Sequence, residues 1–301
     1  MTLVQGVPPA VARHRVRLAL RRAREARGLT QQHVAETLEW SLSKVNRIES
    51  GDVNISSTDL QAMLRLFEVT DPDRVQQLLA DARQARSRGW WWEKPHYREN
   101  LTPGILSLMQ YEMGASEIRV FHPTLVPGLL QTHDYAEYVL NFWANELSEA
   151  ERDTRLEIRM WRREQALMRP DPPNYLVILD ESVMSRHVGG TRIMSEQLNE
   201  LAALASEPHI TVRIVPFADA AVLTILGPFI IFDLGASDGE VLYRETQLLD
   251  ELNEETSVIV RYRKYFDQMW NRCMTREESL RLIESSAAEM LSSIDRGRPL
   301  P

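Results

Sequence analysis

A pair of short helices separated by a tight turn, between residues 30 and 50, is the feature that most constrains the fold of this chain. The first segment, TQQHVAETL (30–38), places Val34 and Leu38 on one face, which predicts a helix that packs inward on that side. Ala35 lies where a small side chain lets another helix approach closely. The spacing therefore predicts a helix whose buried side receives a neighbour.

The second segment, SLSKVNRIES, begins with Ser41, a favourable N-cap because its hydroxyl can accept a backbone N–H of the first turn. Trp40 before the cap and Val45 within the helix have the spacing of a hydrophobic staple. Gly51 follows the last turn and can take the left-handed conformation that ends a helix. The two segments therefore predict short helices that meet at an angle.

The outward face of the second helix carries groups that suit base edges in a major groove. With Val45 and Ile48 directed inward, Asn46 faces outward and suits adenine, whereas Lys44 or Arg47 suits guanine or a nearby phosphate. Leu42 suits a thymine methyl. The predicted DNA-binding residues are Arg17, Gln31, Gln32, Ser41, Leu42, Ser43, Lys44, Asn46 and Arg47. The alternative is a solvated surface helix whose neighbouring arginines only maintain solubility.

The distribution of charge favours the first of these interpretations. The whole chain has a formal net charge of −8, but residues 1–90 contain 14 Lys or Arg and 10 Asp or Glu, against 21 and 33 in the rest. Seven arginines lie between Arg13 and Arg27 and supply a local positive field for phosphates. The acidic remainder should limit indiscriminate binding to nucleic acid.

Helical periodicity alone runs from residue 13 to about 88, with further helices expected at 56–68 and 71–87. We therefore predict an all-α domain over 1–88. A stretch rich in Trp, Pro and Gly at 89–104 breaks this periodicity and predicts a linker. Its three consecutive tryptophans are interpreted as packing between domains, with base stacking or ligand caging as the alternative.

A mixed domain is predicted over 105–292, followed by a flexible tail at 293–301. The fold class is thus multidomain, α followed by α+β, with a sheet of about four or five strands surrounded by helices. The run 118–121 is expected to add an edge strand. Helices are predicted at 132–144, 149–169, 192–206, 254–272 and 276–292, and strands at 175–179, 210–215, 229–234 and 241–245.

The segment with the sequences REARGLTQ (24–31) and RIESG (47–51) resembles the Xre, Cro and phage-repressor family of helix-turn-helix proteins. The resemblance implies that the first short helix anchors on the DNA backbone and the second enters the major groove. Three residues depart from the family pattern. Glu39 stands where the turn often has glycine, Leu42 replaces a polar residue, and His33 replaces the Glu that would complete a capping box.

The later sequence YEMGASEIRVFHPTLVPGLLQTHDYAEYVL, with LDESVMSRHVGG, TVRIVPF and FDQMW, resembles the poorly characterised C-terminal domain of many actinobacterial Xre-type regulators. This resemblance implies a sensing or interaction role, with a small acidic partner protein or a small-molecule effector. It implies no chemistry.

Neither a metal-ligand spacing nor a glycine-rich phosphate loop is present in the sequence, so no metal, cofactor or enzymatic activity is expected. Cys273 is interpreted as a buried apolar residue. Five charged or polar residues lie near strand ends or in segments that can converge on them: Arg159, Arg163, Glu181, His187 and Glu245. They either line a ligand or partner site or form salt bridges that fix helices to the sheet.

The sequence as a whole predicts a transcription regulator that binds double-stranded DNA as a homodimer, with half-sites about one helical turn apart. A protein-interaction module and a DNA-tethered enzyme are the alternatives. The N-terminus lacks a secretory signal and no apolar run would cross a bilayer, which predicts a cytoplasmic protein without membrane contact. The apolar segment 123–132 is expected to be a rigid packed loop, with a docking lip for a partner as the alternative.

Overall fold

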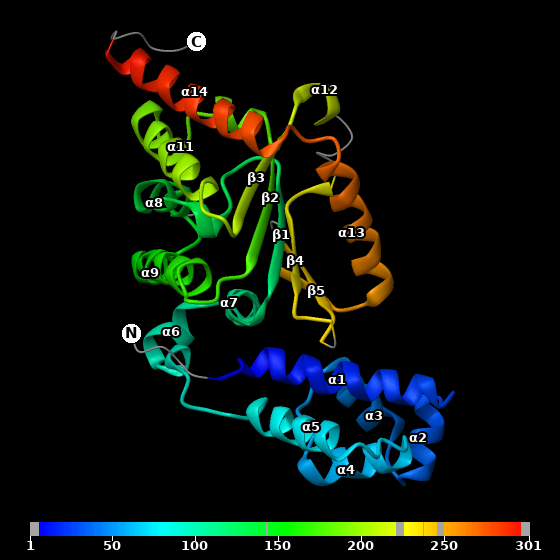
Figure 1. The fold of residues 1–301 in the computed structure, drawn as a ribbon. Coiled ribbons are helices and arrows are strands. Elements are labelled where there is room, and N and C mark those ends of the chain that lie inside the picture. The colour runs from blue at the N-terminus through cyan, green and yellow to red at the C-terminus, as the bar shows by residue number, and fades with distance from the viewer. Residues whose placement is uncertain (1–5, 143, 221–225, 237, 246–249, 296–301) are drawn as a thin grey trace. The chain divides into compact units, whose positions relative to one another are not determined.

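The computed structural model divides into two compact units. The first contains Met1–Lys94 and Leu234–Gly239, and the second contains Pro95–Asp233 and Glu240–Pro301. The residues that the structure describes are all those outside 1–5, 143, 221–225, 237, 246–249 and 296–301. Figure 1 shows a helical first unit and a second unit built on a sheet.

The first unit is all helical over its N-terminal part, as the periodicity predicts. Its helices are α1 (Pro9–Ala26), α2 (Gln31–Thr37), α3 (Leu42–Ser50), α4 (Ser57–Leu66) and α5 (Pro72–Gln84). Helix α1 begins before residue 13, where the sequence suggested a start, because Pro9 occupies the first helical position, for which its fixed φ suits it. Gly28 follows α1 with φ +66° and lets the chain turn towards α2.

One apolar core joins these helices. Leu20 of α1, Val34 of α2, Val45 of α3 and Leu60 of α4 are each fully buried, and Leu78 of α5 is 1% exposed. Each helix contributes residues spaced by three or four, so the core follows directly from the sequence periodicity. This packing fixes α3 by its inner face and leaves its outer face to solvent.

The stretch 89–104, expected to be a linker, contains short helices: the 3-10 turn η1 (Trp91–Glu93), α6 (Pro95–Asn100) and the start of α7 (Pro103–Gly114). Pro95 and Pro103 each occupy the first position of a helix, where proline is tolerated. Neither proline therefore prevents helix formation in this stretch. Trp90, Trp91 and Trp92 are buried, and the rings of Trp90 and Trp92 stack with centroids 4.5 Å apart. Buried indoles are not available to stack on bases.

The second unit is built on a mixed sheet, which has six strands in the described part of the chain. Their order is β3-β2-β1-β4-β5-β6. The first three pair in parallel and the others pair antiparallel. The strands are β1 (Glu117–His122), β2 (Asn174–Asp180), β3 (Ile210–Val215), β4 (Phe229–Asp233), β5 (Glu240–Glu245) and β6 (Asp250–Asn253).

This mixed architecture confirms the predicted fold class and corrects two details. Strand β1, expected at an edge, lies in the interior between β2 and β4, with Ile118 and Phe121 buried. Its position follows from pairings with strands more than 50 residues away, which local periodicity does not show. Strand β6, with the sequence DELN, takes an edge position that was not predicted because it lacks apolar alternation.

Five predicted helices of the second unit are present: α8 (His133–Asn141), α9 (Glu149–Leu167), α11 (Thr191–Ala205), α13 (Thr256–Trp270) and α14 (Arg276–Asp295). The short helices α10 (Ser182–Ser185) and α12 (Phe217–Ala220) are additional. Figure 1 shows α8, α9 and α11 on one side of the sheet and α13 on the other. None of the described helices combines the length and apolar character needed to cross a membrane. Helix α14 extends to Asp295, so the first residues of the predicted tail are helical.

Candidate nucleic-acid interface

The turn between α2 and α3 is fixed by hydrogen bonds at both helix ends. Thr30 caps α2 by accepting the N–H of His33 at 3.1 Å, and Ser41 caps α3 by accepting that of Lys44 at 3.2 Å. At the end of α2, the N–H of Trp40 donates to the carbonyl oxygen of Ala35 at 2.8 Å, the longer bond of a Schellman ending. This geometry directs α3 away from α2 within the four residues that separate the two helices.

Glu39 takes the left-handed conformation that this ending requires, with φ +54°. A residue with a Cβ pays about 1–2 kcal/mol for this conformation. The left-handed conformation at residue 39 therefore explains why related helix-turn-helix sequences often have glycine there. This chain adopts that conformation with glutamate.

The α2–α3 pair is locked to α1 by a buried carboxylate. The side chain of Glu49 on α3 is 3% exposed, and Arg24 of α1 donates two hydrogen bonds to it, from Nε at 2.7 Å and Nη2 at 3.0 Å. Gln31 of α2 donates its side-chain N–H to the same carboxylate at 2.8 Å. Three helices thus meet on one buried anion, which sets the angle between them.

The outward face of α3 is exposed as the sequence predicts. Ser43, Asn46 and Arg47 are exposed, and Leu42 is 41% exposed although it is apolar. In the described part of the chain, the side chains of Asn46 and Arg47 have no hydrogen bond or ion pair. They are therefore available to an external partner.

Other predicted contact residues are engaged within the first unit. The Nζ of Lys44 lies 3.0 Å from an Asp59 oxygen and 3.7 Å from the centre of the Trp40 ring, so it points along the flank of α3. Gln32 donates to Glu36 at 2.7 Å, and the Ser41 hydroxyl serves as a cap. These residues are placed beside the exposed face and not at its centre.

Arg17 lies on α1 beside the end of α3. Its Nη1 donates to the carbonyl oxygen of Ser50 at 3.4 Å, and its side chain packs against Gly51. The guanidinium thus sits next to the C-terminal end of α3, where a cation is favourable. Sequence reasoning placed it with the DNA contacts but did not foresee this bond.

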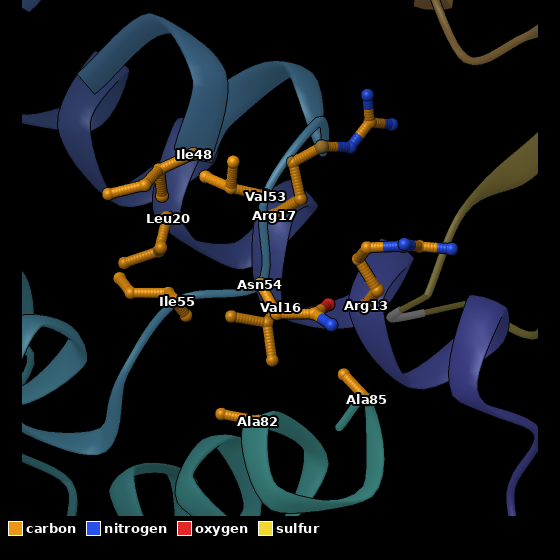
Figure 2. Close-up of a pocket in the computed structure, with 10 residues that line it drawn as sticks. All are labelled: Arg13, Val16, Arg17, Leu20, Ile48, Val53, Asn54, Ile55, Ala82 and Ala85. Carbon is orange, nitrogen blue, oxygen red and sulfur yellow. The ribbon is translucent and has the colours of Figure 1, made fainter. Parts of the chain in front are cut away.

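A small cavity lies behind α3, between α1, the loop after α3 and α5. Figure 2 shows the side chains of Val16, Ile55 and Ala82 facing one another, while the guanidiniums of Arg13 and Arg17 extend away from them. The cavity is lined by Arg13, Val16, Arg17, Leu20, Ile48, Val53, Asn54, Ile55, Ala82 and Ala85. Its apolar walls belong to the core that supports α3.

The five candidate residues of the second unit do not form a single constellation in the contacts described. Arg159 donates to Oε1 of Gln131 at 2.7 Å, and Arg163 pairs with Glu200. Glu181 accepts the backbone N–H of Phe217 at 2.8 Å, and His187 lies 3.2 Å from the hydroxyl of Thr191. These contacts fasten loops and helices. Glu245 ends β5, and its side chain lies outside the described residues.

The apolar segment 123–132 is packed, as the first of its two interpretations predicts. Val126 and Leu130 are fully buried, and Gln131 donates its side-chain N–H to the carbonyl oxygen of Val126 at 2.7 Å. The alternative, in which this segment is a docking lip for a partner, would need exposed apolar side chains, whereas Val126 and Leu130 are buried. Gln131, 3% exposed, is a structural residue that sequence reasoning missed because a polar residue in a loop carries no periodic signal.

The Cys273 thiol and three polar side chains of α8 are the remaining groups with possible chemistry in the described part of the second unit. Burial raises the pKa of Cys273 to about 12, so this thiol is not a nucleophile at neutral pH, as expected for a buried apolar residue. His133, Asp134 and Glu137 of α8 bring potential metal ligands within 4.8 Å of one another on an exposed helix. Asp134 also lies within 4.0 Å of Arg192, and exposed charges of this kind commonly pair with each other.

The fold and the exposed face of α3 define a helix-turn-helix DNA-binding protein with a second, sheet-containing domain. The family model described as "Helix-turn-helix domain" matches residues 16–78. The model described as "Domain of unknown function (DUF5753)" matches residues 105–285, and the chain belongs to that family. No curated protein and no solved structure matched the chain.

Proposed function

We propose that this chain is a sequence-specific transcription regulator that binds a two-fold symmetric DNA site as a homodimer in the cytoplasm. The observation that carries the proposal is the outer face of α3, where Asn46 and Arg47 are exposed without partners among the described residues while the inner face is buried. The amide of Asn46 and the guanidinium of Arg47, on consecutive residues, can each make two hydrogen bonds to a purine. A helix with this face fits the major groove.

The neighbouring residues support a division of roles. Arg17, Gln32 and Lys44 flank the exposed face and are suited to phosphate oxygens, whereas Leu42 and Asn46 are suited to base edges. Gln31 orients α2 through Glu49 and acts on DNA indirectly. The second unit, in this proposal, senses a ligand or a partner protein and does not turn over a substrate.

The test is selection of a binding site from random duplexes by the full chain, followed by fluorescence anisotropy on the selected site and on a scrambled one. Replacing Arg47 with Ala is expected to weaken binding to the selected site by about 5- to 150-fold, the equivalent of 1–3 kcal/mol. Binding to the scrambled duplex should change much less, because that binding depends on phosphates.

Arg65→Ala is the matched control, because Arg65 is also exposed in the first unit but lies in the last turn of α4. It should leave the preference for the selected site unchanged. Equal loss in the two variants, or selection of no site at all, would refute sequence-specific binding through α3. A complex of one chain per duplex in analytical ultracentrifugation would refute the homodimer.

A further inference from the structure

The turn that joins β4 to β5, the β4–β5 turn, belongs to the first unit together with the helices. It comprises Leu234–Gly239. The backbone N–H of Leu234 donates to the carbonyl oxygen of Gly239 at 3.0 Å, which closes the turn, and Leu234 is buried. The helical unit is therefore completed by a segment far along the sequence from α1, since 224 residues separate His14 from Asp238.

Three contacts hold the β4–β5 turn on α1. The ring Nε2 of His14 lies 2.9 Å from the carbonyl oxygen of Asp238, and Nε of Arg15 lies 2.7 Å from a carboxylate oxygen of the same residue. Gly239 has φ +76°, and a Cβ at this position would lie 2.7 Å from a methyl carbon of Leu18. The close approach to α1 therefore requires a residue without a side chain at position 239.

His14 lies between the β4–β5 turn and Arg17. It is 2% exposed, and Nη2 of Arg17 lies 3.3 Å from Nδ1 of its ring. A guanidinium only donates and a carbonyl oxygen only accepts, so Nδ1 accepts from Arg17 while Nε2 carries the proton and donates to Asp238. Burial and the charge of Arg17 lower the pKa of His14 to about 4, so the ring is neutral at pH 7, as these two bonds require.

Arg17 extends this series of contacts to the end of α3. Its Nη1 donates at 3.4 Å to the carbonyl oxygen of Ser50, the last residue of α3. Gly51 leaves room for the Arg17 stem, because a Cβ there would lie 3.3 Å from Cδ of Arg17. The hydroxyl of Ser50 donates in turn to the carbonyl oxygen of Arg47 at 3.3 Å. The series, the His14 relay, therefore runs from the Asp238 carbonyl through His14, Arg17 and Ser50 to the backbone of Arg47.

We propose that His14 is a positioning residue for α3, which carries the placement of the β4–β5 turn through Arg17 to the last turn of that helix. A displaced turn would cost the buried ring its bond to Asp238, and the loss of a buried hydrogen bond favours a shift of the ring and of Arg17 with it. The consequence for DNA rests on the function proposed above, whereas the mechanical link to α3 does not.

Gly239→Ala in the full chain is the first test, because the added methyl group meets Leu18 and displaces the β4–β5 turn. It should weaken binding to the selected DNA site about tenfold, a size common for coupled sites, and change binding to the scrambled duplex much less. Gly235→Ala is the matched control. It places a Cβ at φ +102° in the same turn, but that Cβ would have no atom within 4 Å, so the selected site should be bound as by the unchanged chain.

Two variants of His14 test the relay itself. His14→Phe keeps a planar ring but loses both hydrogen bonds, whereas His14→Gln keeps an amide that can donate to Asp238 and accept from Arg17. The Phe variant should lose about tenfold in affinity for the selected site, and the Gln variant should recover most of it. Adding Gly239→Ala to His14→Phe should cause little further loss, because both changes interrupt one series of contacts.

Hydrogen exchange of the DNA-free chain, read on peptides that cover 46–55, separates the relay from the proposed function. Exchange there should be faster in Gly239→Ala than in Gly235→Ala, whether or not a DNA site is selected. Equal exchange in the two glycine variants overturns the proposal. A His14→Phe variant that is less stable to heat but keeps its full preference for the selected site also overturns it, and so do additive losses in the double variant. Faster exchange without any selected site removes only the regulator function.

Discussion

The buried carboxylate of Glu49 allows a sharp test of what holds α3 in place. Glu49→Ala removes the acceptor for two hydrogen bonds from Arg24 and one from Gln31. The side chains of Arg24 and Glu49 are 11% and 3% exposed, so water replaces these bonds poorly. Breaking a buried pair by removing one partner costs about 3–5 kcal/mol.

The measurement is hydrogen exchange with mass spectrometry on the full chain, read on peptides that cover 30–50. A loss of about 3 kcal/mol should speed exchange of the protected amides there by roughly 150-fold, whereas peptides of the β-sheet should not change. A second variant, Arg24→Met with Glu49→Leu, replaces the pair by apolar groups and should recover most of the loss.

Two results would contradict this reasoning. Unchanged exchange in Glu49→Ala would show that apolar packing alone positions α3. A double variant as unstable as Glu49→Ala would show that the unpaired charge of Arg24 is not the cause of the loss, since both variants also remove the hydrogen bond from Gln31 to Glu49.

Three further sites allow tests of the fold: Glu39, His122 and the pair of Lys44 with Asp59. Glu39→Gly should raise the free energy of unfolding by about 0.5–1 kcal/mol, because glycine relieves the positive φ but adds chain entropy, and thermal unfolding will measure it. The second unit should lose up to about 3 kcal/mol of stability as the pH falls from about 6.5 to 4. Over this range His122 binds a proton in the unfolded chain but not in the folded one, where burial lowers its pKa to about 4. Urea unfolding of His122→Asn should therefore show a shallower dependence on pH. Asp59→Asn should cost less than 1 kcal/mol, since the pair with Lys44 is partly exposed, and it should strengthen DNA binding at low salt in anisotropy measurements by freeing a cation.

The helical unit could be predicted closely because its signals are local. Ser41, predicted to cap the second short helix, accepts the backbone N–H of Lys44. Val45 and Ile48 are buried as their spacing requires. Caps and 3.6-residue periodicity depend on neighbours within one or two turns, so the sequence carries them directly.

The arrangement of the sheet and the polar contacts could not be read in the same way. The interior position of β1 depends on β2 and β4, both distant in sequence. The pairing of Lys44 with Asp59 and that of Gln31 with Glu49 depend on where separate helices meet. His122 carried no signal of its own, because its surroundings come from a loop, α9 and the end of a strand.

The exposure of Leu42 has a consequence for how the protein would read modified DNA. A leucine at 41% exposure on α3 gains by contact with a methyl group in the major groove and gains nothing from polar base edges. Thymine carries such a methyl group, and 5-methylcytosine carries one at the same ring position. If Leu42 meets a base as the proposed function requires, we therefore expect binding to be sensitive to uracil substitution and to cytosine methylation at that base.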